Sequence, residues 1–147
     1  MNYPFKLFTL IFLSVFLLNA CNNKQDKSVE VGLLIHSFDN ERWENDRDFF
    51  VEKVQELGGT VKVETAENDA GKQLAQAKEL LSGGVDVLVV VPVDQFAAAE
   101  IVNEAHAHNV KVISYDRLIK NCKLDYYVST DNVEIGEMQA NYLARIK

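Results

Sequence analysis

The sequence predicts an α/β fold: an open, mostly parallel sheet flanked by helices on both faces. Strand-like apolar segments recur about every 25–30 residues with amphipathic helical segments between them, which is the pattern of βαβ units. The run "VLVVV" at 87–91 has no polar alternation, as expected for a central strand that is buried on both sides. Right-handed crossovers then give the flavodoxin-like strand order 2-1-3-4-5.

Spacing identifies the helices, and turn residues mark the ends of the elements. Trp43 and Phe50 lie at helical spacing in the first helix, and Gly83–Gly84 ends the second. Pro92 ends the third strand, and Asp94 is a candidate N-cap for the third helix. The predicted strands are 28–36, 58–66, 85–92, 110–116 and 124–131, and the predicted helices are 40–57, 70–84, 94–109 and 132–147.

The N-terminus is predicted to direct export rather than to join the fold. Residues 7–18 form an apolar segment of signal-peptide length, so residues 1–20 are interpreted as a signal peptide. The following "LNAC" resembles a bacterial lipobox, which predicts lipidation of Cys21 and a membrane anchor, with residues 21–28 as a polar tether. An ordinary secretory signal with a chance cysteine is the alternative, and it also exports the chain.

Composition excludes several classes of function. With 15 basic and 22 acidic residues the net charge is −7, so a nucleic-acid partner is not expected. If Cys21 is lipidated, Cys122 has no disulfide partner, and it is interpreted as a small loop residue rather than a reactive thiol. His106 and His108 do not share a helix face and are interpreted as surface residues, so no metal site is expected. No Gly-rich phosphate loop follows the first strand, and no cofactor is expected.

The segments with interesting chemistry follow the carboxyl ends of strands. Asp116 and Arg117 follow the fourth strand, and "HSFDNERW", "PVDQ" and "STDN" follow the first, third and fifth. Ligands of open α/β sheets bind at this edge. Carboxylate, guanidinium and the indole of Trp43 together suit a neutral, polyhydroxylated ligand. The alternatives are a surface ion pair between Asp116 and Arg117, and a Trp43 that packs its helix onto the sheet.

Four segments carry a family resemblance. "ERWENDRDFFVEKVQELGG", "GGVDVLVVVP", "VKVISYDRLI" and "STDNVEIGEMQA" resemble the D-xylose-binding branch of the periplasmic sugar-binding proteins of ABC importers, over residues 29–147. The resemblance implies a sugar ligand, a membrane permease as partner, a monomer and no enzymatic activity. Acids are usual in the family where this chain has His36 and Ser37, which leaves the identity of the sugar open. The ligand-binding residues that it implies are Arg42, Trp43, Asp116, Arg117, Asp131 and Asn132.

The resemblance also implies how the chain is divided. Residues 29–127 correspond to the first of two lobes that close on the ligand by a hinge motion. Residues 128–147 correspond to the hinge crossing and to the first helix of a second lobe whose remainder is absent. A single lobe is expected to bind sugar weakly. In this reading Asp131 and Asn132 lie near the hinge, and the alternative is that they cap the last helix.

Two other functions remain open. The same pair of lobes serves as an extracytoplasmic sugar-sensing input for membrane receptors or kinases. A flavodoxin-like enzyme or a receiver domain has the same strand order, but a receiver needs a lysine after the fifth strand, and "STDN" has none. No nucleophile, base and orienting group fall together on the predicted edge, so catalysis is not expected.

Overall fold

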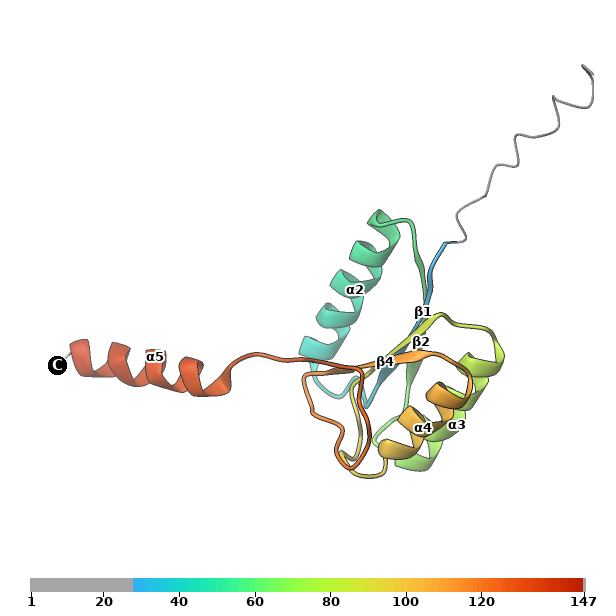
Figure 1. Ribbon diagram of the computed structural model, residues 1–147. Coiled ribbons are helices and arrows are strands. Elements are labelled where there is room, and N and C mark those ends of the chain that lie inside the picture. Colours follow the sequence, from blue (N-terminus) through green and yellow to red (C-terminus); the bar gives the residue numbers. More distant parts are fainter. Residues whose placement is uncertain (1–27, 147) are drawn as a thin grey trace, which may run out of the picture.

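The computed structural model describes residues 28–146 and confirms the predicted fold class (Figure 1). Five parallel strands form one sheet in the predicted order β2-β1-β3-β4-β5. The predicted signal peptide, Cys21 and the tether up to residue 27 lie outside the described residues. The strands are β1 (Glu30–Ile35), β2 (Thr60–Thr65), β3 (Val87–Val90), β4 (Lys111–Tyr115) and β5 (Tyr126–Val128).

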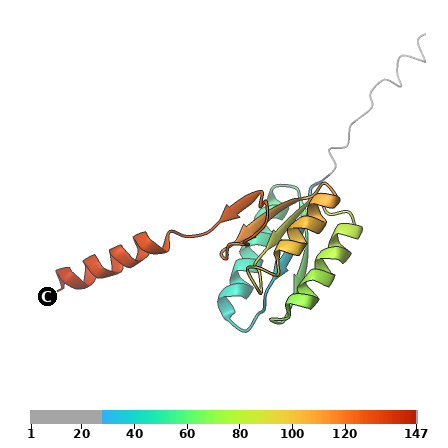
Figure 2. The ribbon, with the colours of Figure 1, turned by 60° about the horizontal axis from the view of Figure 1, so that its bottom comes forward.

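Helices cover the two faces of the sheet unequally (Figures 1 and 2). Helix α2 lies alone on one face, and α3 and α4 lie side by side on the other. A fourth helix, α5, extends away from the sheet (Figure 1). The helices are α2 (Glu41–Glu56), α3 (Ala70–Ser82), α4 (Ala99–Ala107) and α5 (Asn132–Arg145).

The start of α4 differs from the prediction. The helix begins at Ala99 rather than at residue 94, and no side chain caps it. Asp94 instead caps the turn that precedes the helix, since its Oδ1 accepts from the N–H groups of Phe96 at 2.8 Å and Ala97 at 2.7 Å. The prediction that Asp94 caps the third helix is therefore wrong, because this side chain caps the turn that leads into α4.

Two apolar cores lie on the two faces of the sheet. The larger core is packed under α3 and α4, and it includes Leu34, Leu88 and Ile101, which are 0–1% exposed. Helix α3 lies close to β1 there, because a Cβ on Gly32 would come within 3.0 Å of the Cδ1 atom of Leu80 in α3. The smaller core lies under α2, and Trp43 is its largest side chain. Burial of these apolar side chains is the main force that holds the sheet between its helices.

The strand register brings the polar loops to one edge of the sheet. Leu34 of β1 lies beside Val90 of β3, which lies beside Ser114 of β4. In the next pair, Tyr115 lies beside Val128 of β5. The loops that follow β1, β3 and β4 therefore start at nearly the same height, as parallel strands require.

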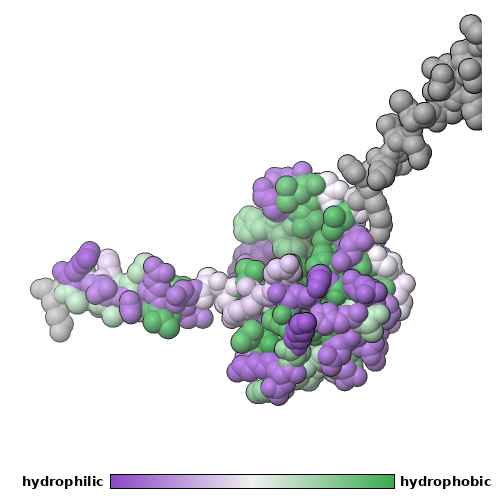
Figure 3. Space-filling view, in the orientation of Figure 1, coloured by the Kyte–Doolittle hydropathy of each residue, from purple (hydrophilic) through white to green (hydrophobic). Residues whose placement is uncertain are grey.

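Helix α5 has no core of its own. Asp131 is its N-cap, with Oδ1 accepting from the N–H groups of Val133 and Glu134 at 3.0 and 3.1 Å. None of its described residues is buried, and Met138 and Tyr142 are among its exposed apolar side chains. Figure 3 shows hydrophobic and hydrophilic residues together on the surface of this helix.

Within residues 28–146, no helix has both the length and the apolar character needed to span a bilayer.

Candidate functional site

The turn after β4 holds Asp116 in a left-handed conformation. Its φ is 62°, which is uncommon for a residue other than glycine. The N–H of Arg117 donates to the Tyr115 carbonyl at 2.7 Å, so Asp116 stands at the centre of a three-residue turn. Strand β5 holds the turn: the Asp116 N–H donates to the Val128 carbonyl at 2.8 Å, and the Ser129 hydroxyl donates to the Asp116 carbonyl at 3.1 Å.

The partner of Asp116 is Arg42 rather than its neighbour Arg117. Arg42 Nη2 donates to Asp116 Oδ1 at 2.6 Å, and Arg42 Nε lies 3.5 Å from Asp46 Oδ2, one turn along α2. The Asn40 side chain accepts from the Arg42 N–H at 2.9 Å and caps the helix. The hydrogen bond to Asp116 raises the pKa of the Arg42 guanidinium. The alternative of an Asp116–Arg117 pair is thus wrong, and the ion pair instead joins the first turn of α2 to the turn after β4.

Arg117 extends toward the ends of β1 and β3. Its Nη2 lies 3.2 Å from His36 Nε2, and its Nη1 donates to the Pro92 carbonyl at 3.3 Å. The Ser114 hydroxyl donates to the Arg117 carbonyl and also accepts the Ile119 N–H at 3.1 Å. The backbone of this arginine is therefore anchored, and its guanidinium keeps donors that are not used by these contacts.

Trp43 packs α2 against the sheet. Its side chain is 5% exposed and belongs to the smaller core. The His36 ring meets the indole edge-on with centroids 4.7 Å apart, and the Arg42 guanidinium lies 4.6 Å from the indole centroid. The packing interpretation of Trp43 is confirmed, and a contact of its indole with a ligand stays a prediction.

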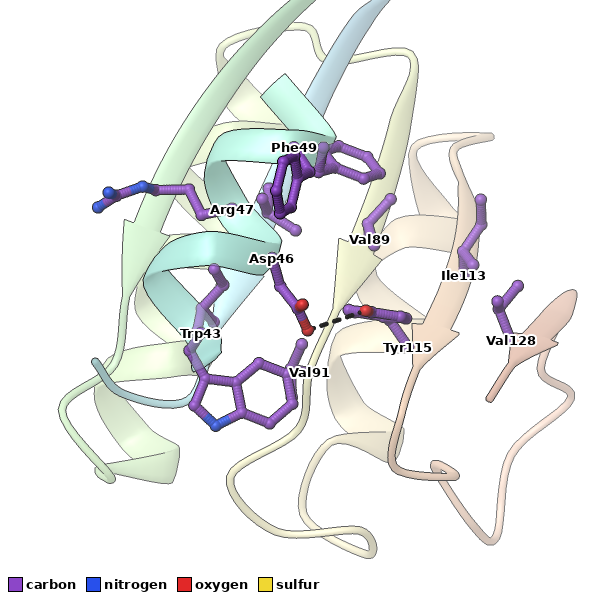
Figure 4. Close-up of a pocket in the computed structure, with 12 residues that line it drawn as sticks. Trp43, Asp46, Arg47, Phe49, Val89, Val91, Ile113, Tyr115 and Val128 are labelled. Carbon is purple, nitrogen blue, oxygen red and sulfur yellow. Dashed lines mark hydrogen bonds between the residues drawn. The ribbon is translucent and has the colours of Figure 1, made fainter. Parts of the chain in front are cut away.

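An apolar groove adjoins this edge on the α2 face (Figure 4). It has a volume of about 370 Å³ and lies between α2 and the strands β3, β4 and β5. The Tyr115 hydroxyl donates to Asp46 Oδ2 at 2.9 Å at its polar end. Burial and this hydrogen bond raise the pKa of Tyr115. The groove is lined by Leu33, Ile35, Trp43, Asp46, Arg47, Phe49, Phe50, Val89, Val91, Ile113, Tyr115 and Val128.

The two residues predicted near the hinge do not join this cluster. Asp131 and Asn132 lie at the start of α5, and no hydrogen bond or ion pair of the described chain connects them to Arg42, Asp116 or Arg117. The capping alternative for Asp131 is confirmed. A role of this pair in binding stays a prediction.

Sequence reasoning missed two members of the cluster. Asp46 lies one helical turn after Arg42, and this spacing was a usable signal for an ion pair. Tyr115 directly precedes Asp116, but its hydroxyl reaches back to α2, which only the tertiary structure brings near.

The two helix histidines are not equivalent surface residues. His108 is exposed, but His106 is half-buried and its Nε2 lies 2.8 Å from Asp125 Oδ2. In residues 28–146 no group of three or more histidine, cysteine or acidic side chains is placed to hold a metal ion. Cys122 is free and partly buried, and burial raises the pKa of its thiol. A thiol with a raised pKa is a weaker nucleophile at neutral pH.

The chemistry of the cluster suits an uncharged polar ligand. Arg42 contacts the carboxylates of Asp46 and Asp116. Arg117, the residue after Asp116, adds a second guanidinium at the same edge, so two positive and two negative charges balance there. Among the described contacts none occupies Asp116 Oδ2, which leaves an acceptor beside the guanidinium donors. Acceptors and donors side by side match the hydroxyl groups of a polyol.

The comparisons with known proteins agree with this chemistry. The chain is 38% identical over 126 residues to the D-xylose-binding periplasmic protein of Haemophilus influenzae, covering 86% of this chain and 38% of that protein. It is 39% identical over 120 residues to the protein of the same name from Escherichia coli, covering 82% of this chain and 36% of that protein.

The chain is also similar to a solved structure of a sugar-bound protein. The carbohydrate transporter solute binding protein of Chloroflexus aurantiacus, in complex with D-glucose, superposes with a TM-score of 0.73 at 36% identity. The match covers 81% of this chain and 35% of that chain, so this chain spans little more than a third of the length of each of these relatives. The family described as periplasmic binding protein domain matches residues 31–147. The chain therefore belongs to the periplasmic binding protein domain family.

Proposed function

We propose that the chain forms one lobe of an exported binding protein that delivers a monosaccharide to the membrane permease of an ABC importer. The observation that carries the proposal is the ion pair between Arg42 and Asp116 at the carboxyl edge of the sheet. It joins the first turn of α2 to the turn after β4, which are far apart in the sequence, and it sets donors and acceptors side by side, as sugar hydroxyls need. Relatives named for D-xylose support an aldopentose as the ligand.

The roles of the residues follow from their contacts. Asp116 accepts hydrogen bonds from sugar hydroxyls through its uncommitted oxygen, and Arg42 and Arg117 donate to hydroxyl or ring oxygens. Trp43 supplies an apolar surface for C–H groups. Asp131 and Asn132 act at the hinge between this lobe, residues 29–127, and a second lobe that begins within 128–147. Lipidation of Cys21 after removal of residues 1–20 holds the protein at the membrane.

This proposal assigns no catalytic step to the chain. The relatives are named as binding proteins. In the proposed role the sugar is bound and released without covalent change. The sensing role, which the sequence leaves open, is not favoured by these relatives. A monomer that binds one sugar is the expected working form.

The test is calorimetric titration with D-xylose, ribose, arabinose, galactose and glucose into the protein expressed from its complete gene. The informative variant is Asp116→Asn, because asparagine tolerates the left-handed backbone, removes the charge and replaces one acceptor oxygen with a donor NH₂ group. The matched control is Asp48→Asn, whose carboxylate is exposed and contacts only Arg47 among the described partners. Binding of one pentose that is lost in Asp116→Asn and kept in Asp48→Asn supports the proposal. A folded protein that binds none of the five sugars contradicts it.

A further inference from the structure

His36 occupies a buried position between Trp43 and Arg117. It directly follows β1 and is 6% exposed. On one side, the His36 ring packs against the Trp43 indole at an interplanar angle of 86°. On the other side its Nε2 atom lies 3.2 Å from Arg117 Nη2.

This geometry fixes the protonation state of the ring. A guanidinium group only donates hydrogen bonds, so Nε2 of His36 must accept, and the ring is neutral with its hydrogen on Nδ1. The Nδ1 atom is buried and has no hydrogen-bond partner among the described residues. A second proton on the ring would sit on Nε2, directly against the guanidinium of Arg117, and would replace a hydrogen bond with a repulsion between two cations.

We propose that neutral His36 positions the Arg117 guanidinium for the ligand, and that protonation of His36 releases this guanidinium and weakens sugar binding. The inference rests on the proposed function, because it assigns regulation to the same site. Without the His36 acceptor, the Arg117 guanidinium keeps one described hydrogen bond, to the Pro92 carbonyl at 3.3 Å. A guanidinium held by one long contact is less well ordered for a ligand than one held at two nitrogens.

His36 acts through Arg117 rather than by touching the sugar. Its Nε2 is engaged with Arg117, and its Nδ1 is buried. An aspartate at this position would hold Arg117 throughout the neutral and mildly acid range. A histidine makes this contact with Arg117 depend on pH, because the ordinary pKa of imidazole lies close to neutral pH.

The charges around His36 agree with a neutral ring at neutral pH. Arg117 and Asp116 face it from the turn after β4, Asp39 faces it from its own loop, and Trp43 of α2 is uncharged. Burial lowers the pKa of His36 from its ordinary value of 6.5, and Arg117 lowers it further. Asp116 and Asp39 oppose these effects. The release of Arg117 therefore belongs to the mildly acid range below pH 6.5.

The experiment compares sugar affinity between about pH 8 and about pH 5 in the protein expressed from its complete gene. His36→Gln keeps an acceptor near Nε2 but does not titrate, and His36→Leu removes the acceptor. His106→Gln is the matched control, because His106 pairs with Asp125 at the opposite edge of the sheet. Denaturant unfolding shows whether each variant folds, and if His36→Leu does not fold, the comparison rests on His36→Gln.

We expect the wild-type protein and His106→Gln to lose about tenfold in affinity on acidification, because protonation of His36 replaces its hydrogen bond with Arg117 by a repulsion between two cations. His36→Gln should bind with little dependence on pH, and a folded His36→Leu should bind weakly at every pH. The inference is overturned if His36→Gln keeps the wild-type pH dependence, or if folded His36→Leu binds as tightly as the wild type.

A second readout separates this inference from the proposed function. Imidazole ¹⁵N spectra without sugar should show Nε2 of His36 unprotonated at neutral pH, and the Arg117 side-chain signals should shift with the same midpoint as His36. If no sugar binds at any pH, the proposed function fails, while this readout still tests the hold of His36 on Arg117. Arg117 signals that do not follow the titration of His36 contradict the inference.

Discussion

The sheet has an amino edge, where its parallel strands begin, and a carboxyl edge, where they end. Each edge pairs a histidine with a charged partner, but the two edges differ in how many of their polar groups have hydrogen-bond partners. At the amino edge, the Asp125 carboxylate accepts hydrogen bonds from Lys111 Nζ at 2.7 Å and from the Val112 N–H at 3.0 Å. Its Oδ2 atom also lies 2.8 Å from His106 Nε2. At the carboxyl edge, one ring nitrogen of His36 is buried without a described partner.

This difference separates structural from functional polar groups. Asp125 ties the start of β4 to the loop before β5, and its partners lie on neighbouring elements of one sheet region. The carboxyl edge keeps unused hydrogen-bonding groups, which cost stability unless another molecule uses them. We infer that the amino edge serves the fold and that the carboxyl edge serves the ligand.

The largest expected effect is a loss of sugar affinity in Arg42→Gln. The substitution removes a charge-assisted donor and leaves Asp116 without its cation, so affinity should fall about a hundredfold, or roughly 3 kcal/mol. Stability should change little, because the Arg42 side chain is 52% exposed. Calorimetric titration measures the affinity, and Lys111→Gln at the amino edge is the control. A similar loss of affinity in Lys111→Gln would remove the distinction between the two edges.

The next effect is a loss of stability in Asp125→Ala. The substitution leaves the N–H of fully buried Val112 without its acceptor, which should lower the free energy of unfolding by about 2 kcal/mol. Urea unfolding measures this change. Sugar affinity should stay at the wild-type value, since Asp125 lies at the other end of β4 from Asp116. Unchanged stability together with weaker sugar binding would reverse the assignment of the two edges.

The smallest effect is a difference between the edges in how stability depends on pH. The hydrogen bonds of Asp125 outweigh its burial and lower the pKa of its carboxyl group, and burial together with Arg117 lowers the pKa of His36. Both pKa values lie below those of the unfolded chain, so the unfolded state binds protons first as the pH falls, and stability is lost. The His36 contribution should be lost below pH 6.5, and the Asp125 contribution below pH 3.8.

Unfolding free energies measured across this pH range should therefore fall in two stages. His36→Gln should remove the first stage, and Asp125→Asn should remove the second. A single stage that neither variant alters would show that other groups control the acid sensitivity.

The sequence alone predicted the sheet and its order, because the relevant forces act over short distances along the chain. Burial can be predicted from apolar runs such as 87–91 and from the helical spacing of Trp43 and Phe50. Right-handed crossovers then restrict the order of strands to few choices. The shifted start of α4 was not predictable, because Asp94 caps equally well a helix or the turn that precedes one.

The sequence by itself also determined which residues reach the carboxyl edge, since each follows a strand of a parallel sheet. Only the tertiary structure decided how they pair there. Arg42 and Asp116 are 74 positions apart, and Arg117 and His36 are 81 apart, so no local pattern connects either pair. Side-chain pairing depends on distances across the fold and on the backbone angle of Asp116, and neither of these can be predicted from local sequence patterns.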